Sequence, residues 1–261
     1  MKAALEMVRI FRDGLAELQA DPDPALGRHT QWLGWSEVAG LELRRVFADE
    51  RLSAALREAG AHARMFSLGP AAVIELFEEW TWRLDEVIRE LERLQAFAAI
   101  PGHVVVPDTS ALVEGPIFDT FDWHSLGGLE PAEPVRVVVP ILVVEEPDRL
   151  KIGKGNTRVR SVLKKLWDLH GDAPAEPAPM PQAKPGPATI EVWLDEPWHA
   201  RLPVADAEII ARASGFATLM GKQVVLASGD TSQLYRASAA DLAPALMLKP
   251  APEDQALGQP T

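Results

Sequence analysis

The sequence predicts an α/β protein, a three-layer α/β/α domain with a mainly parallel sheet, preceded by an all-α N-terminal region. Two observations support this prediction. The first hundred residues contain almost no strand pattern, whereas the rest of the 261-residue chain alternates short valine-rich runs with helical segments. These runs are almost continuously apolar, which is typical of parallel strands covered by helices on both faces. We place the boundary between the two regions near Pro101-Gly102.

The N-terminal region, residues 1–100, is predicted to be a set of helices that serves packing, oligomerisation or partner docking. Two Asp-Pro pairs at 21–24 end the first helix, because proline disfavours helix at its own position and at the one before. A long helix begins at Pro70. Its apolar side chains have the spacing of a coiled-coil seam: Val73, Phe77, Trp80, Leu84, Val87, Leu91, Leu94 and Ala98. We interpret the seam as a core face; the alternative is a homodimer or protein-partner interface through residues 70–98.

The second region, residues 101–250, is predicted to contain five strands separated by helices. The strand runs lie at 103–106, 135–139, 189–194, 223–227 and 245–248. Residues 171–188 hold six of the 22 prolines, so we expect an exposed loop without regular structure there. The βα pattern resumes after this loop, which places it inside the domain. Residues 251–261 are predicted to form a flexible tail.

Composition limits the partners and the chemistry. The chain has 26 Lys and Arg against 38 Asp and Glu, a net charge of −12, so its surface as a whole does not attract nucleic acid or anionic lipid. It has no cysteine, which excludes disulfides, cysteine nucleophiles and thiolate metal sites. Charged residues break up the N-terminal apolar stretch, and the longest apolar run, 137–144, is far shorter than the roughly 18 residues of a membrane span. We expect a cytoplasmic protein without a membrane partner.

Acidic residues directly follow two of the predicted strands. Asp108 follows the first strand run and Asp230 follows the fourth, each just before a predicted helix. In open α/β sheets, ligands bind beyond the carboxyl ends of the strands. Either aspartate alone is better explained as a turn or helix-capping residue. Their shared context favours a common site.

A third acid, Asp206, lies in the segment 203–213, which is predicted to open a helix. Asp206 has Ile209 and Ile210 three and four positions later, so we expect its carboxylate on the apolar, inward-facing side. Glu208 has Arg212 four positions later and is interpreted as a solvated ion pair, at most a supporting neighbour of the site.

A fourth acid follows the second strand run, where Glu145 and Glu146 are adjacent. Both have apolar residues three and four positions before them, so periodicity does not choose between the two. Several carboxylates without histidine or cysteine partners make an all-oxygen site suited to Mg²⁺ or Mn²⁺. Such ions can activate water and stabilise the leaving oxygen in phosphodiester cleavage.

A basic strip close to these acids offers a means of holding a phosphate-rich strand. Positions 149–165 contain seven basic residues and no acidic one. Local attraction to phosphate is therefore expected despite the net negative charge, the alternative being a solvated helix face. The proposed nucleic-acid-binding residues are Arg149, Lys151, Lys154, Arg158, Arg160, Lys164 and Lys165.

Taken in order, four segments resemble the PIN-domain family of metal-dependent nucleases, over about residues 103–249. The segments are Val-Val-Pro-Asp108-Thr-Ser-Ala-Leu, Val-Val-Glu-Glu146-Pro-Asp-Arg-Leu, Asp206-Ala-Glu-Ile-Ile-Ala-Arg-Ala and Val-Leu-Ala-Ser-Gly-Asp230-Thr. The resemblance implies that these four numbered acids are the catalytic, metal-holding residues, and it selects Glu146 over Glu145. Pro147 stands where similar proteins usually have leucine, and it disfavours a helical conformation at Glu146. The predicted supporting neighbours are Ser110, Ser228, Thr231 and Glu208.

The resemblance implies an Mg²⁺- or Mn²⁺-dependent endoribonuclease acting on single-stranded or structured RNA. The residues themselves do not distinguish RNA from DNA. The alternative is a non-catalytic nucleic-acid-binding or regulatory module with the same fold, although a pure binder gains nothing from four acids that repel phosphate. A phosphotransfer domain with Asp108 as nucleophile is a weaker hypothesis, because the nearest lysine, Lys222, lies before the fourth strand.

Overall fold

The computed structural model divides into two compact units, Met1–Ala99 and Ile100–Thr261. It describes residues 1–20, 26–46, 51–66, 70–127, 129–130, 132–150, 157–171, 176–180, 187–196 and 199–247. The Asp-Pro pairs at 21–24 and the predicted tail at 251–261 lie outside these residues. None of the described helices is long and apolar enough to cross a membrane.

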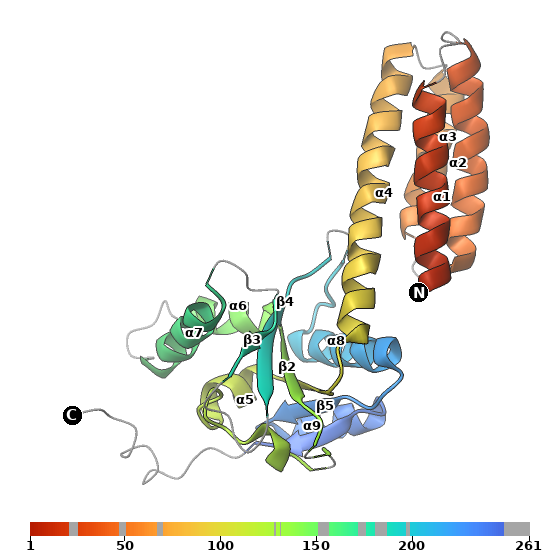
Figure 1. Cartoon of the computed structure of the whole chain (residues 1–261). Helices are drawn as coiled ribbons and strands as arrows, with labels where there is room; N and C mark the ends of the chain where they lie inside the picture. The colour runs from red at the N-terminus through yellow and green to blue at the C-terminus, as the bar shows by residue number, and fades with distance from the viewer. Residues whose placement is uncertain are drawn as a thin grey trace. The chain divides into compact units, whose positions relative to one another are not determined.

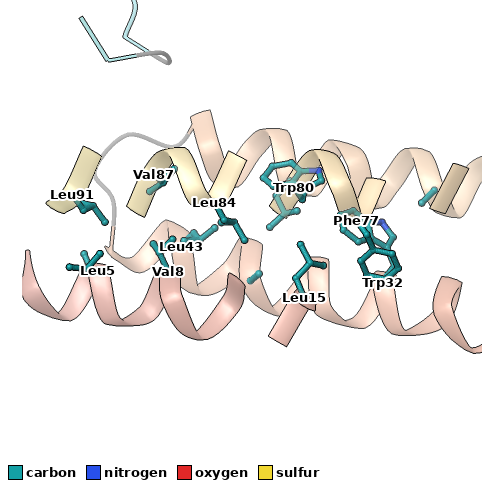
Figure 2. Packing of buried hydrophobic residues seen from close by; sticks show 14 of the residues in the cluster. Leu5, Val8, Leu15, Trp32, Leu43, Phe77, Trp80, Leu84, Val87 and Leu91 are labelled. Atoms are coloured by element: carbon teal, nitrogen blue, oxygen red, sulfur yellow. The ribbon is translucent and has the colours of Figure 1, made fainter. Parts of the chain in front are cut away.

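The first unit is a bundle of long helices (Figure 1). The helices are α1 (Lys2–Ala20), α2 (Leu26–Val46), α3 (Arg51–Phe66) and α4 (Pro70–Ala99). The seam of α4 is buried from Val73 to Leu91 and packs against α1 and α2, in one hydrophobic cluster that also includes side chains of α3. Trp80 and Leu84 lie in the middle of the cluster (Figure 2). Leu94 is partly buried against the same cluster. Over this length the seam is therefore a core face of its own unit.

The second unit is built on a six-stranded sheet with the order β3-β4-β2-β1-β5-β6. The strands are β1 (His103–Pro107), β2 (Val135–Pro140), β3 (Ala178–Pro179), β4 (Ala188–Trp193), β5 (Val225–Ser228) and β6 (Ala243–Leu246). Every pair is parallel except β3 with β4. All six residues of β2 are buried, as expected for a central parallel strand. The predicted α/β fold with a mainly parallel sheet is confirmed.

One part of the segment 171–188 departs from the prediction of an irregular loop. Ala178 and Pro179 form β3, which pairs with Ile190 and Thr189 of β4 in antiparallel register. A strand of two residues leaves no periodicity to recognise, and Pro179 is tolerated because β3 lies at the edge of the sheet. Within this segment, residues 172–175 and 181–186 lie outside the described residues.

Helices cover both faces of the sheet. They are α5 (Thr109–Glu114), the short 3₁₀ helix η1 (Trp123–Ser125), α6 (Ile141–Leu150), α7 (Thr157–His170), α8 (Ala205–Met220) and α9 (Thr231–Ala239). The chain moves from β1 to β2 and β4 in one direction, then returns to β5 and β6 on the other side of β1. Right-handed crossovers therefore put α5, α6 and α7 on one face and α8 and α9 on the other, in agreement with the two groups of helices in Figure 1.

The prediction that Pro147 disfavours helix at Glu146 is wrong. α6 continues through Pro147 to Leu150. Since proline has no N–H, position 147 cannot donate to the carbonyl of Val143, and α6 lacks one of its own hydrogen bonds there. Glu146 thus lies on a helical backbone, at a turn that the helix alone holds less firmly.

Candidate active site

Strands β1 and β5 end side by side, at the point where the direction of the sheet order reverses. The backbone N–H of Asp108 donates to the carbonyl of Ala227 at 2.9 Å. Asp108 caps α5, with Oδ1 accepting from Ala111 N at 2.7 Å, and Asp230 caps α9, with Oδ1 accepting from Ser232 N at 2.8 Å. The capping interpretation therefore holds for both aspartates. The same geometry fixes both carboxylates at the carboxyl edge of the sheet.

Asp108 is the buried acid of this edge, with only 6% of its surface exposed. Besides the bond to α5, its Oδ1 accepts from Ser110 Oγ at 2.8 Å and its Oδ2 from Ser228 Oγ at 2.5 Å. Burial raises the pKa of Asp108, these hydrogen bonds lower it, and the charge of Asp206 raises it further; the net direction is upward. The position of the Asp108 carboxylate is thus fixed from three sides.

All four predicted carboxylates, Asp108, Glu146, Asp206 and Asp230, line one cavity of about 280 Å³. They come from the ends of β1 and β5, from α6 and from the first turn of α8. Glu146 accepts a hydrogen bond from the hydroxyl of Thr109. The rest of the lining is Thr109, Ser110, Val113, Glu114, Pro147, Val159 and Ile209. Folding therefore brings together acids that are up to 122 positions apart in the chain, between Asp108 and Asp230.

Asp206 is more exposed than we predicted. Half of its side-chain surface is exposed, and Arg236 Nη1 lies 3.6 Å from its Oδ2. Gln233 donates to its backbone carbonyl at 3.0 Å. The inward face of α8 is instead made by Glu208, Ile209, Ala213 and Phe216. Asp206 lies in the first turn, where a side chain reaches past the end of the packed face into the cavity.

Glu208 belongs to a different cluster from the four cavity acids. Its carboxylate accepts from His199 Nε2 at 2.6 Å, Leu202 N at 2.9 Å and Arg212 Nε at 3.0 Å. The predicted ion pair with Arg212 exists, but it is not solvated: the two side chains are 2% and 10% exposed. Glu208 does not line the cavity, so any support that it gives to the site passes through the backbone of α8.

The structure separates Glu145 from Glu146, which periodicity left undecided. Glu146 lines the cavity, whereas Glu145 makes a two-point contact with Arg201. Arg201 also binds Asp195. The contact between Arg201 and Glu145 could not be predicted from the sequence, because the two residues are 56 positions apart and no local pattern connects them.

Two of the predicted supporting serines connect the strand ends. Ser228 Oγ donates to Asp108 and accepts from the backbone N–H of Asp230 at 2.8 Å. Ser110 Oγ accepts from Gly229 N at 2.8 Å. A Cβ at Gly229 would lie 3.1 Å from Ser110 Oγ, so a side chain there would press on this contact. Thr231 is exposed at the start of α9.

The basic strip is only partly available to a phosphate strand. Arg158 donates to two backbone carbonyls at the end of α5. Lys165 binds both carboxylate oxygens of Asp119 at 2.9 Å, and Lys164 pairs with the aspartate one turn further along α7. Arg160 is exposed and makes no ion pair with the part of the chain that the structure describes. The remaining members are outside the described side chains: Arg149, Lys151 and Lys154.

We expect acid to destabilise the second unit partly through Glu208. Burial raises the pKa of Glu208, but hydrogen bonds from Leu202 N and His199 and the charge of Arg212 outweigh it, and the pKa is lowered overall. A lowered pKa gives stability that is complete above the unfolded value of about 4.3 and is lost as the pH falls through the folded value. Urea unfolding between pH 7 and pH 3 measures this loss. Glu208→Gln should be less stable at pH 7 and less sensitive to acid; equal sensitivity would contradict this assignment.

The donor chemistry of the cavity fits a hard divalent cation. Its four candidate ligands offer only carboxylate oxygens, the donors that Mg²⁺ and Mn²⁺ prefer. Within the described residues, no three His, Cys, Asp or Glu side chains already form a group that could hold a metal ion. The acids therefore share a cavity without a closed coordination shell.

The second unit matches the model of a known protein family. A family model described as PIN domain matches residues 105–245, more than half of the chain. The matched residues include the four predicted carboxylates that line the cavity. A comparison with curated proteins finds no match to the chain.

Proposed function

Because the chain belongs to the PIN-domain family, we propose that it is a metal-dependent endonuclease that hydrolyses phosphodiester bonds in RNA. PIN domains are generally nucleases. The observation that carries the proposal is that the four predicted carboxylates, which come from separate elements, line a single cavity. Like charges in one small cavity repel each other, so a bound cation is the natural compensation.

Asp108, Glu146, Asp206 and Asp230 would hold Mg²⁺ or Mn²⁺. When bound, the ion would act as a Lewis acid toward a phosphate oxygen and lower the pKa of water. The surrounding side chains orient the ligands. The hydroxyls of Ser110 and Ser228 fix both oxygens of Asp108, and Thr109 holds one oxygen of Glu146.

The substrate strand would reach the cavity along α7. Val159 belongs to the apolar part of the lining, and the next residue, Arg160, is exposed. Arg160 is therefore the member of the strip best suited to a phosphate contact. The other described members are engaged in the contacts to α5, Asp119 and α7 itself.

The test is cleavage by the purified chain of labelled single-stranded RNA, structured RNA and DNA. We expect RNA cleavage with Mn²⁺ or Mg²⁺ that chelator abolishes. Asp206→Asn should reduce the rate at least about 100-fold, because even residues that only orient metal ligands are worth 10- to 100-fold. The matched control is Asp241→Asn, which makes the same chemical change at an exposed position outside the cavity.

The possible outcomes separate the alternatives. Cleavage that persists in Asp206→Asn would contradict the assigned site. Cleavage of DNA alone would contradict the substrate. Binding of RNA without cleavage of any nucleic acid would favour the non-catalytic module. Equal loss in Asp241→Asn and Asp206→Asn would show that the effect is not specific to the cavity.

A further inference from the structure

An arginine in the segment before α8 contacts α6, the helix that carries Glu146. Arg201 Nη1 and Nη2 bind Glu145 Oε2 and Oε1 at 2.5 and 3.0 Å. The third nitrogen, Nε, binds Asp195 Oδ2 at 2.5 Å. Glu145 directly precedes Glu146 in α6. Arg201 therefore holds the same helical turn from which Glu146 reaches the cavity.

The same segment is attached to α8 at the turn that carries Asp206. Asp195 Oδ1 accepts from Arg212 Nη2 at 2.7 Å, and Arg212 also binds Glu208. Glu208 accepts the backbone N–H of Leu202 at 2.9 Å. Because α8 has no side-chain hydrogen bond at its N-cap, this carboxylate provides the attachment between the entering chain and the helix. Asp206 lies two positions before Glu208, inside this attached turn.

The proline in α6 explains why an outside contact matters for Glu146. Position 147 provides no N–H, so the helix loses the hydrogen bond to the carbonyl of Val143. The turn that includes Glu145 and Glu146 is then held by its contact with Arg201 in addition to its own hydrogen bonds. A two-point guanidinium contact fixes direction as well as distance, which an ammonium group does not.

We propose that Arg201 is a positioning residue of the acidic cavity. By joining α6 to the first turn of α8, it fixes the relative positions of Glu146 and Asp206. The proposal rests on the proposed function, because that function assigns both carboxylates to one metal site. Arg201 is not part of the cavity lining, so it acts through these two residues.

The test compares Mn²⁺ binding and cleavage in wild type, Arg201→Lys and Glu145→Gln. Mn²⁺ affinity is measured from the electron paramagnetic resonance signal of the free ion, well below the unfolding temperature of each variant. We expect both variants to bind Mn²⁺ about 10-fold more weakly, as for other groups that orient metal ligands. In the cleavage assay at a fixed Mn²⁺ concentration, kcat should fall and KM for RNA should stay within about twofold, because the substrate contact on α7 is unchanged.

The chain offers a matched control in Arg93, whose Nε and Nη2 also make a two-point contact with a glutamate, Glu90, both bonds at 2.8 Å, within α4. Arg93→Lys should leave Mn²⁺ affinity and kcat unchanged. A wild-type Mn²⁺ affinity in Arg201→Lys and Glu145→Gln would overturn the proposal. Thermal unfolding of each variant checks that it folds, and either variant alone suffices for the comparison.

The experiment also separates this proposal from the proposed function. Mn²⁺ binding that depends on Asp206, without cleavage of any RNA or DNA, would overturn the nuclease proposal and leave the positioning role to be decided by the affinities. Absence of Mn²⁺ binding in the wild type would overturn both. A rise in KM with unchanged kcat and Mn²⁺ affinity would overturn the positioning role and assign Arg201 to substrate binding.

Discussion

Arg212→Met is expected to lower the free energy of unfolding of the second unit by about 3–5 kcal/mol, the usual loss when one partner of a buried ion pair is removed. The guanidinium of Arg212 binds Glu208, Glu196 and Asp195 with its three nitrogens. Removing it leaves Glu208 buried with less compensation for its charge. Methionine fills much of the same volume, so the loss reports on charge and hydrogen bonding more than on a cavity.

Hydrogen exchange of the α8 amides in urea measures this loss in the second unit alone. Lys222→Met is the control: it removes an exposed cation that lies 3.5 Å from Glu133 in the same unit, and it should cost about 1 kcal/mol or less. Adding Glu208→Gln to Arg212→Met should restore part of the stability, because the uncompensated charge is gone. A loss below about 1 kcal/mol for Arg212→Met would contradict a buried network.

The parts of the fold that sequence predicts correctly are those with a local signal. Continuous valine runs identify β1 and β2, and an acid after a strand identifies Asp108 and Asp230, because parallel strands end at a common edge. The strand β3 has no such signal. Its two residues become a strand only by pairing with β4, which begins ten positions after β3 begins. Non-local pairing of this kind leaves no periodicity in the sequence.

In the site, too, features with a local sequence signal were predicted, whereas those that depend on residues remote in sequence were not. Helical periodicity could not choose between Glu145 and Glu146, because the choice depends on Arg201, a partner remote in sequence. The same periodicity predicted that Asp206 faces inward and Glu208 outward. Periodicity does not show at which residue a helix first packs against the rest of the protein. In the structure the buried carboxylate is Glu208. Hydrogen bonds from His199 and Leu202, in the preceding segment, compensate for the free energy of burying its charge.

For the basic strip, the number of charges in the sequence does not show how many of them are available to bind phosphate. A run of cations without acids predicts a phosphate-binding surface only if the cations have no partners elsewhere in the fold. Lys165 is bound to Asp119, 46 positions away, and Arg158 is bound to carbonyls of α5. Among the described members, this leaves Arg160 as the clearest candidate for a substrate contact.

Asp108→Asn is expected to reduce metal-dependent cleavage at least about 100-fold, for the same reason as Asp206→Asn, while changing the free energy of unfolding by about 1 kcal/mol or less. The amide oxygen can still accept from Ser110 and Ala111, which both bind Oδ1. The amide nitrogen can donate to Ser228 Oγ. The Ser228 hydroxyl can then donate to the carbonyl of Asp230, which lies 3.3 Å away. All the hydrogen bonds are replaced, and a buried charge is removed.

Asp108→Ala is the control variant, because it should lose both activity and stability, whereas Asp108→Asn should lose activity alone. It also removes the carboxylate, but it takes away the acceptor at Asp108 for the hydroxyls of Ser110 and Ser228 and leaves α5 without its cap, which alone costs about 0.5–2 kcal/mol. Cleavage assays and urea unfolding of both variants should therefore show equal loss of activity and unequal stability. Asp108→Asn that cleaves RNA at near the wild-type rate would show that the charge of Asp108 is not used by the site. A large loss of stability in Asp108→Asn would show that the ionised carboxylate itself holds the ends of β1 and β5 together.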